Sequence, residues 1–227
     1  MASGFDRVRT QVRAAAERAG RDPAGITLMV VTKSIDVARI RDVVAAGAVD
    51  LGENRVQEAT DKQAQLAGAS LRWHLIGHLQ TNKARRAATG FASVQSIDSE
   101  RIGFALADRR PAEDVPLPVL IEVDFTRGLA RTGASAEQAT SIAAAVLSRP
   151  SLELRGLMTV APMGSEPQAR AAFVQLRRLR DDLEQHLSVS LPDLSMGMSG
   201  DFETAIEEGA TIVRLGTIIL GGRQANR

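Results

Sequence analysis

The stretch that decides the fold is Leu194–Arg223, LSMGMSGDFETAIEEGATIVRLGTIILGGR. It predicts a strand, a polar turn, a short helix, a second strand and a second turn. The two turns, Ser199-Gly200 and Gly216-Thr217, each follow an apolar strand. Backbone N–H groups of small residues at such strand ends can converge on a phosphate, because glycine lets the backbone approach closely. In an eight-stranded barrel the loops after the last two strands usually hold the phosphate, so this stretch predicts the end of such a barrel.

The rest of the chain supplies six further strands that alternate with helices. The strands are predicted at 26–31, 49–51, 73–76, 92–95, 116–123 and 152–159, and the fourth is the weakest. The helices are predicted at 5–19, 37–44, 56–66, 82–88, 99–106, 136–147 and 167–187. The first strand is a continuous apolar run, as expected where both faces are buried. This alternation, without internal repeats, predicts a (β/α)₈ TIM barrel with an extra N-terminal helix, forming one domain over residues 1–227.

An open doubly wound sheet is the alternative fold. Its dinucleotide fingerprint needs glycines in the first strand–helix turn, and the turn at 32–36 (TKSID) contains none. A nucleotide P-loop is also rejected, because the glycine-rich segment at 216–221 is followed by Gly222 where that motif has lysine. The sequence therefore favours the barrel.

The composition excludes several classes of function. A net charge of +1 argues against broad electrostatic contact with nucleic acid, and an aromatic content of 3% leaves few stacking platforms. The absence of cysteine excludes disulfides, thiolate metal sites and cysteine nucleophiles. The N-terminus lacks the apolar core of a signal peptide, and no apolar run reaches the roughly 18 residues that a membrane span requires. We expect a cytoplasmic protein that binds neither nucleic acid nor membranes.

In a barrel of this type, side chains at the C-terminal ends of the strands face the functional mouth. The residues at these positions are Lys33, Asn54, His74, His78, Asp124, Met158, Ser199, Arg214, Gly216 and Thr217. Lys33 directly follows the first apolar strand and Thr32. Desolvation and nearby cations at such a mouth favour a neutral amine, which condenses with an aldehyde. The alternative is a solvated lysine at a strand end.

Arg214 lies among apolar residues on the last strand, and a buried charge without a partner is costly. One interpretation is an ion pair with Glu203, Glu207 or Glu208. The other is that Arg214 faces an acceptor on a bound ligand, such as a ring nitrogen.

His74 and His78 have the spacing of a helical metal pair. Gly77 and the apolar residues between them place the two histidines on a strand and its following loop instead. Since no third ligand is evident, we expect no metal site. Either histidine can line a pocket.

Seven motifs carry a family resemblance. They are VVTKS at 30–34, GENRVQE at 52–58, WHLIGHLQTNK at 73–83, SIDS at 96–99, GLMTVAP at 156–162, LSMGMSGDFETAI at 194–206 and VRLGTIILGGR at 213–223. In this order, over nearly the whole chain, they resemble the pyridoxal phosphate (PLP) homeostasis protein family, also called YggS/PROSC. The resemblance implies a fold-type III PLP barrel like the N-terminal domain of alanine racemase.

The resemblance also implies roles for individual residues. PLP is expected as a Schiff base on Lys33, with Arg214 beside the pyridine nitrogen. The phosphate is expected at the two turns that contain Ser199, Gly200, Gly216 and Thr217. Asn54 belongs to a motif near the cofactor, and His74 and Met158 are candidate pocket-lining residues. This chain departs from many relatives at Ile35 and Arg131, where they have lysines, so any handover of PLP that uses those lysines is in question.

The chemistry agrees with a role other than catalysis. An arginine cannot accept a proton from the pyridine, so the ring nitrogen stays unprotonated and the electron sink is weak. Racemisation needs a second acid/base, which alanine racemase is understood to take from a tyrosine in its extra C-terminal domain, and this chain has no tyrosine. We therefore expect no catalytic residue, and a monomer that stores or delivers PLP to apo-enzymes and maintains vitamin B6 balance. An amino-acid racemase and a phosphosugar enzyme are the alternatives.

Overall fold

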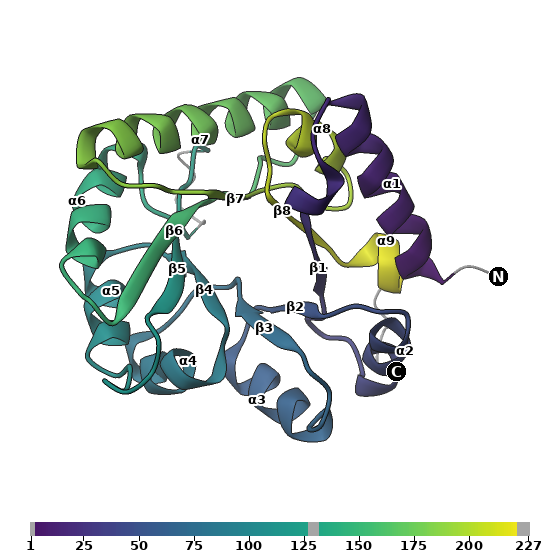
Figure 1. Cartoon of the computed structure of the whole chain (residues 1–227), viewed down its shortest axis with the longest axis horizontal. Helices are drawn as coiled ribbons and strands as arrows, with labels where there is room; N and C mark the ends of the chain where they lie inside the picture. The colour runs from purple at the N-terminus through teal and green to yellow at the C-terminus, as the bar shows by residue number, and fades with distance from the viewer. Residues whose placement is uncertain (1–2, 127–131, 222–227) are drawn as a thin grey trace.

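The computed structural model describes residues 3–126 and 132–221, and these residues form a closed barrel of eight parallel strands surrounded by helices (Figure 1). Each strand pairs with the next one along the chain, and β1 pairs with β8 to close the barrel. The strands are β1 (Thr27–Val31), β2 (Asp50–Glu53), β3 (Arg72–Leu75), β4 (Ser93–Ile97), β5 (Leu117–Glu122), β6 (Leu152–Met158), β7 (Asp193–Ser195) and β8 (Ile212–Leu215). The predicted fold class is confirmed.

The α-helices lie outside the strands and shield the barrel from solvent (Figure 1). They are α1 (Gly4–Arg18), α2 (Val37–Ala45), α3 (Val56–Gln65), α4 (Ala84–Gly90), α5 (Glu100–Ala107), α6 (Ala136–Leu147), α7 (Glu166–Leu187), α8 (Phe202–Glu207) and α9 (Thr217–Leu220). Two short 3₁₀ turns complete the described elements, η1 (Pro23–Gly25) and η2 (Thr81–Lys83). The predicted extra N-terminal helix is α1, which packs against α8 and α9. No helix in the described part of the chain is both long enough and apolar enough to cross a membrane.

Local sequence explains where several helices begin. Asp36 caps α2, and its carboxylate accepts a hydrogen bond from the Arg39 N–H at 3.0 Å. Ser135 and Gln138 form a capping box at the start of α6, in which each side chain bonds the backbone N–H of the other residue. These signals are local, so the sequence predicts such boundaries to within a residue or two.

Three elements differ from the prediction. The strand predicted at 49–51 is β2, which continues through Gly52 and Glu53. Gly52 faces the barrel interior, where a Cβ would lie 2.8 Å from the sulfur of Met29, so a glycine that reads as a turn belongs to the strand. The weak fourth strand is the fully buried β4. The short helix α9 was predicted as a turn.

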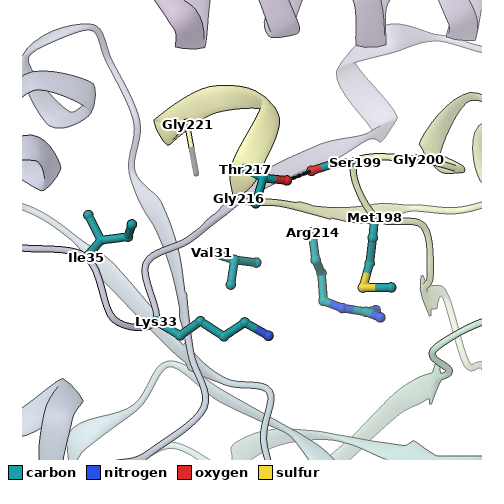
Figure 2. A pocket seen from close by; sticks show the side chains of 10 residues that line it. All are labelled: Val31, Lys33, Ile35, Met198, Ser199, Gly200, Arg214, Gly216, Thr217 and Gly221. Atoms are coloured by element: carbon teal, nitrogen blue, oxygen red, sulfur yellow. Dashed lines mark hydrogen bonds between the residues drawn. The ribbon is translucent and has the colours of Figure 1, made fainter. Parts of the chain in front are cut away.

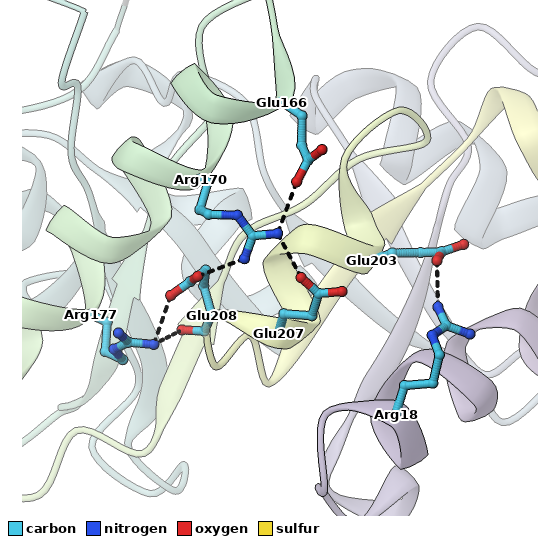
Figure 3. A network of polar contacts seen from close by, with 7 residues as sticks. All are labelled: Arg18, Glu166, Arg170, Arg177, Glu203, Glu207 and Glu208. Carbon is cyan, nitrogen blue, oxygen red and sulfur yellow. Dashed lines mark hydrogen bonds and ion pairs between the residues drawn. The ribbon is translucent and has the colours of Figure 1, made fainter.

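Surface charges tie the last helices together (Figure 3). Arg170 on α7 donates to Glu166 at 2.8 Å, Glu207 at 2.7 Å and Glu208 at 2.8 Å, and Arg177 also reaches Glu208. Arg18 on α1 pairs with Glu203 on α8 at 2.5 Å. The three glutamates on α8 and at its end are therefore engaged by other arginines, and the interpretation that pairs them with Arg214 is wrong.

Candidate functional site

A cavity of about 320 Å³ opens at the C-terminal ends of β1 and β8, beside the loop that follows β7. Ten residues line it (Figure 2), and six of them were singled out from the sequence: Lys33, Ser199, Gly200, Arg214, Gly216 and Thr217. The four others are Val31, Ile35, Met198 and Gly221. Ile35 was singled out from the sequence only as a departure from the family pattern, and Val31 was not singled out as a site residue. Both lie two residues from Lys33 along the chain, and this proximity is the signal that would have placed them in the cavity.

The two predicted turns meet at one wall of the cavity. The Thr217 hydroxyl donates to the Ser199 Oγ at 3.1 Å, although eighteen positions separate them along the chain. The Ile218 N–H also points to the Ser199 Oγ, at 3.5 Å. A Cβ at Gly216 would lie 3.2 Å from the carbonyl oxygen of Val31, so a glycine allows β8 to end close to β1. The hydroxyls and N–H groups form a set of donors suited to an anion.

Arg214 lies almost fully inside the barrel, with 4% of its surface exposed. Nη1 donates to the Ser195 Oγ at 2.8 Å, and Nη2 donates to the Thr159 carbonyl oxygen at 2.8 Å. Desolvation lowers the pKa of Arg214 to about 10, and the charges of Glu122 and Asp201 act in the opposite direction. The guanidinium therefore remains charged at neutral pH, and neutral oxygens hold it in place.

Lys33 lies across the cavity, and its side chain extends towards Arg214 (Figure 2). The residue is exposed, so the desolvation expected from its position at the strand end is absent. The chain contains three lysines. Lys62 is buried in ion pairs and Lys83 lines a separate cavity. Lys33 is thus the lysine whose amine is available to a ligand in this cavity.

A buried ionic cluster anchors the residues on both sides of Lys33. We call Lys62, Glu53 and Glu58 the Lys62 cluster. The Lys62 Nζ donates to Glu53 at 2.5 Å, to Glu58 at 2.7 Å and to the Thr32 carbonyl oxygen at 2.7 Å. The Thr32 hydroxyl donates to Glu53 at 2.7 Å, and the Ser34 N–H donates to Glu58 at 2.6 Å. The loop that carries Lys33 is therefore fixed one residue before and one residue after it.

Burial and hydrogen bonding act differently on the two glutamates of the cluster. Burial raises the pKa of Glu53 and outweighs the hydrogen bonds from Lys62 and Thr32. Burial also acts to raise the pKa of Glu58, but the hydrogen bonds from Lys62 and the Ser34 N–H outweigh it and lower that pKa. The sequence reasoning missed the cluster, although both glutamates belong to the GENRVQE motif. That motif reaches the cavity through the Lys33 loop.

Three of the predicted residues lie away from the cavity. Asn54 lines a neighbouring cavity between the β2–α3 and β3–α4 loops. Met158 is fully buried at the end of β6. His74 lies towards the opposite end of the barrel, where its ring bonds Asp50 and Ser93. His74 is the third residue of the four-residue strand β3 and lines a separate cavity with Asp50 and Ser93, so the structure does not bring it to the cavity that contains Lys33.

The remaining candidates at the mouth have local partners. The His78 Nδ1 lies 2.9 Å from Asp98, and Asp124 accepts hydrogen bonds from Thr126. Ile35, the first departure noted from the family resemblance, is buried and lines the cavity with an apolar side chain. Arg131, the second departure, lies outside the described residues.

Comparison with known proteins places this geometry in a family. Residues 5–224 match the family described as alanine racemase, N-terminal domain. The pyridoxal phosphate homeostasis protein of Pseudomonas aeruginosa is 43% identical, over 98% of this chain and 96% of its own length. That of Escherichia coli K12 is 38% identical, over 100% of this chain and 98% of its own. The chain belongs to the pyridoxal phosphate homeostasis protein family.

Solved structures agree with this assignment. PipY of Synechococcus elongatus, determined with PLP bound, is 35% identical, with a TM-score of 0.82 over 92% of this chain and 98% of its own. Alanine racemase from Corynebacterium glutamicum is 22% identical, with a TM-score of 0.70 over 95% of this chain and 60% of its own, and shares the fold. The predicted family and the predicted likeness to the alanine racemase barrel are confirmed.

Proposed function

We propose that this protein binds PLP and acts in PLP homeostasis, holding the cofactor as a Schiff base on Lys33. The observation that carries the proposal is one cavity of about 320 Å³ lined by an amine, a guanidinium and a pair of hydrogen-bonded hydroxyls. A volume near 300 Å³ is at the lower end of pockets that hold small cofactors. The names of the relatives and the PLP-bound structure of PipY support the same assignment.

Each group in the cavity has a role under this proposal. The Lys33 amine forms a C=N bond with the aldehyde carbon of PLP, and water leaves. Ser199 and Thr217, with the backbone at Gly200 and Gly216, donate to the phosphate. Arg214 donates a hydrogen bond to the pyridine nitrogen. Because a guanidinium has no acceptor, it cannot stabilise a protonated ring nitrogen. PLP supplies an electron-accepting ring when bound, and an arginine at its nitrogen weakens that property.

We further propose that the bound cofactor is stored or delivered without turnover. Racemisation requires acid/base groups on both faces of the substrate. Among the described residues that line the cavity, Val31, Ile35 and Met198 are apolar, and Lys33 carries the one amine. Arg214 is held as a charged guanidinium, so the described lining offers no second acid/base group opposite Lys33. The proposal places the protein in the cytoplasm as a monomer of one barrel domain, with PLP-dependent apo-enzymes as recipients.

The test uses the purified protein incubated with PLP. We expect a visible absorption band, and borohydride reduction should fix one PLP on Lys33, identified by mass spectrometry of peptides. Lys33→Ala should abolish the band and the adduct. Lys83→Ala, which removes an exposed lysine outside the cavity, is the matched control and should retain both. An adduct that persists on another amine in Lys33→Ala would overturn the proposal.

The racemase alternative has a separate readout. The PLP-loaded protein is incubated with single L-amino acids and optical rotation is followed. We expect no change, because the described cavity lacks a second acid/base. A loss of rotation that disappears in Lys33→Ala would show catalysis and overturn the proposal of storage without turnover.

A further inference from the structure

A line of hydrogen bonds crosses the barrel interior from Arg214 to the opposite end of the barrel. Its members are polar side chains on β8, β7, β4, β3 and β2, in the order Arg214, Ser195, Gln95, Ser93, His74 and Asp50. Interiors of such barrels are mostly filled by branched apolar side chains. Buried polar groups persist where their hydrogen bonds are satisfied and fix a specific arrangement, so this line calls for a function.

The end next to the cavity has a defined direction. The Arg214 Nη1 donates to the Ser195 Oγ at 2.8 Å, and the Ser195 hydroxyl donates to the Gln95 Oε1 at 2.7 Å. Ser195 is fully buried and Gln95 is 1% exposed, so water does not compete for these bonds. A serine hydroxyl has a single proton. Because the Ser195 hydroxyl donates this hydrogen to Gln95, the lone pairs of its oxygen remain available to accept the hydrogen bond from Arg214.

The far end completes the line but is coupled less tightly. The Gln95 Nε2 lies 3.5 Å from the Ser93 Oγ, which is the longest step. Ser93 lies 2.7 Å from the His74 Nδ1, and the His74 Nε2 lies 2.9 Å from Asp50. The His74 tautomer that carries its proton on Nε2 and accepts at Nδ1 lets every group in the line donate in the same direction. An amide does not relay protons as a hydroxyl or imidazole does, so Gln95 makes the line an orienting device.

We propose that Gln95 is a positioning residue that acts through the Ser195 hydroxyl to fix the Arg214 guanidinium for its hydrogen bond to the PLP ring nitrogen. This inference rests on the proposed binding of PLP. Arg214 has a second anchor, the Thr159 carbonyl oxygen, which bonds Nη2 at 2.8 Å. One anchor allows the guanidinium to swing about that bond, whereas anchors on both terminal nitrogens fix its plane. Gln95 therefore secures the orientation without touching the cofactor.

The test compares Gln95→Met with Gln95→Glu in the protein loaded with PLP labelled with ¹⁵N in the ring. The methionine variant removes the acceptor for Ser195, and the glutamate variant retains one. We expect Gln95→Met to raise the Kd for PLP roughly 5- to 10-fold, which corresponds to the loss of the one hydrogen bond from Ser195 to Gln95. The ring ¹⁵N resonance, read at saturating PLP, should shift in Gln95→Met and stay near the wild-type position in Gln95→Glu.

Two further variants complete the test. Ser195→Ala removes the linking hydroxyl and should shift the ¹⁵N resonance in the same direction, and it decides the question if Gln95→Met does not fold. Ser96→Ala is the matched control, because Ser96 is the buried neighbour of Gln95 on β4 and its hydroxyl bonds the Gly77 carbonyl oxygen at 2.7 Å, away from Arg214. It should retain the wild-type Kd and resonance.

The outcomes separate the two proposals. If wild-type protein forms no Schiff base, the proposed function fails. Wild-type protein that binds PLP on Lys33 supports the proposed function. If Gln95→Met then keeps the wild-type Kd and ring ¹⁵N resonance, the positioning role of Gln95 is overturned and PLP binding stands. Ser195→Ala replaces Gln95→Met in this comparison if the methionine variant does not fold. An equal shift in Ser96→Ala would also overturn the positioning role, because it would show a general response to a lost buried hydroxyl.

Discussion

The two sides of the cavity are held by different kinds of interaction. On one side the Lys33 loop is fastened by the buried charges of the Lys62 cluster, and Lys33 itself is exposed. On the other side Arg214 is buried and charged, and its two hydrogen bonds go to neutral oxygens. The ionic anchor thus supports the exposed Lys33, and the neutral oxygens hold the buried Arg214.

The difference follows from what each group has to do under the proposed function. An amine that captures and releases an aldehyde needs freedom at its tip, so the structure fixes the backbone around Lys33 and leaves the side chain free. An arginine that only orients a ring benefits from immobility, and neutral acceptors hold it without neutralising its charge. Charge therefore anchors the loop, and geometry anchors the arginine.

The largest expected effect comes from breaking the ionic anchor with Lys62→Met. The buried Glu53 and the half-buried Glu58 then lose their cation, and removing one partner of a buried ion pair costs about 3–5 kcal/mol. We expect urea unfolding to show a loss of this size and PLP binding to weaken, since Thr32 loses a donor as well.

The double variant Lys62→Met, Glu53→Gln is the control for Lys62→Met. It removes one unpaired carboxylate and should recover part of the lost stability. If the single variant is as stable as wild type, or the double variant is less stable than the single one, the ionic anchor does not work as described.

A smaller effect is expected at Asp50, at the far end of the line of hydrogen bonds that begins at Arg214. Hydrogen bonds from His74 and Arg72 outweigh the burial of Asp50 and lower its pKa to about 2. A carboxylate with a lowered pKa contributes stability above its unfolded value near 4, and that contribution is lost as the pH falls towards 2. Asp50→Asn should therefore lower the free energy of unfolding by about 1 kcal/mol at neutral pH, allowing for screening by water. It should also make the free energy of unfolding depend less on pH between about 4 and 2.

Urea unfolding at about pH 7 and about pH 3 measures this difference. Asp181→Asn, which removes an exposed carboxylate paired with Arg180, is the comparison and should change stability little at either pH. If the gap between Asp50→Asn and wild type fails to narrow at the lower pH, the hydrogen bonds to Asp50 do not stabilise its charged form.

The smallest effect concerns the backbone beside Lys33. Ser34 has a φ of 59° and Ser188, after α7, has a φ of 54°, a left-handed conformation that favours glycine. Ser34→Gly and Ser188→Gly should each stabilise the protein by about 0.5 kcal/mol in thermal unfolding, the strain relief exceeding the added freedom of the unfolded chain. Only Ser34→Gly should change the rate of PLP uptake, because it loosens the Lys33 loop. Equal uptake rates in both variants would contradict the described role of that loop.

The sequence predicted the features that depend on local or periodic patterns. The alternation of strands and helices fixed the barrel, and in barrels the mouth is built from strand ends, so Lys33 and the turns at Ser199 and Thr217 could be brought together without coordinates. Arg214 was found because a charge within an apolar strand is unusual.

Features that depend on how far along a strand a residue sits were not predictable. His74 pairs with Gly52 on β2 and Ser93 on β4, and this register between neighbouring strands, which one sequence does not reveal, sets its depth in the barrel. Lys62 reads as an ordinary helix lysine, and its burial follows from the packing of α3 beneath the Lys33 loop. The Gln95–Ser195 bond joins residues 100 positions apart, a separation at which one sequence offers no pairing signal.

The scarcity of lysine has a consequence for selectivity. Of the 28 basic residues three are lysines and the others are arginines, one lysine is locked beneath the loop and another sits outside the cavity. Guanidinium groups do not form Schiff bases with aldehydes at neutral pH, so a surface rich in arginine offers PLP few amines with which to react. Under the proposed function, such a surface keeps the stoichiometry near one PLP per chain and protects the protein from modification by PLP at other sites.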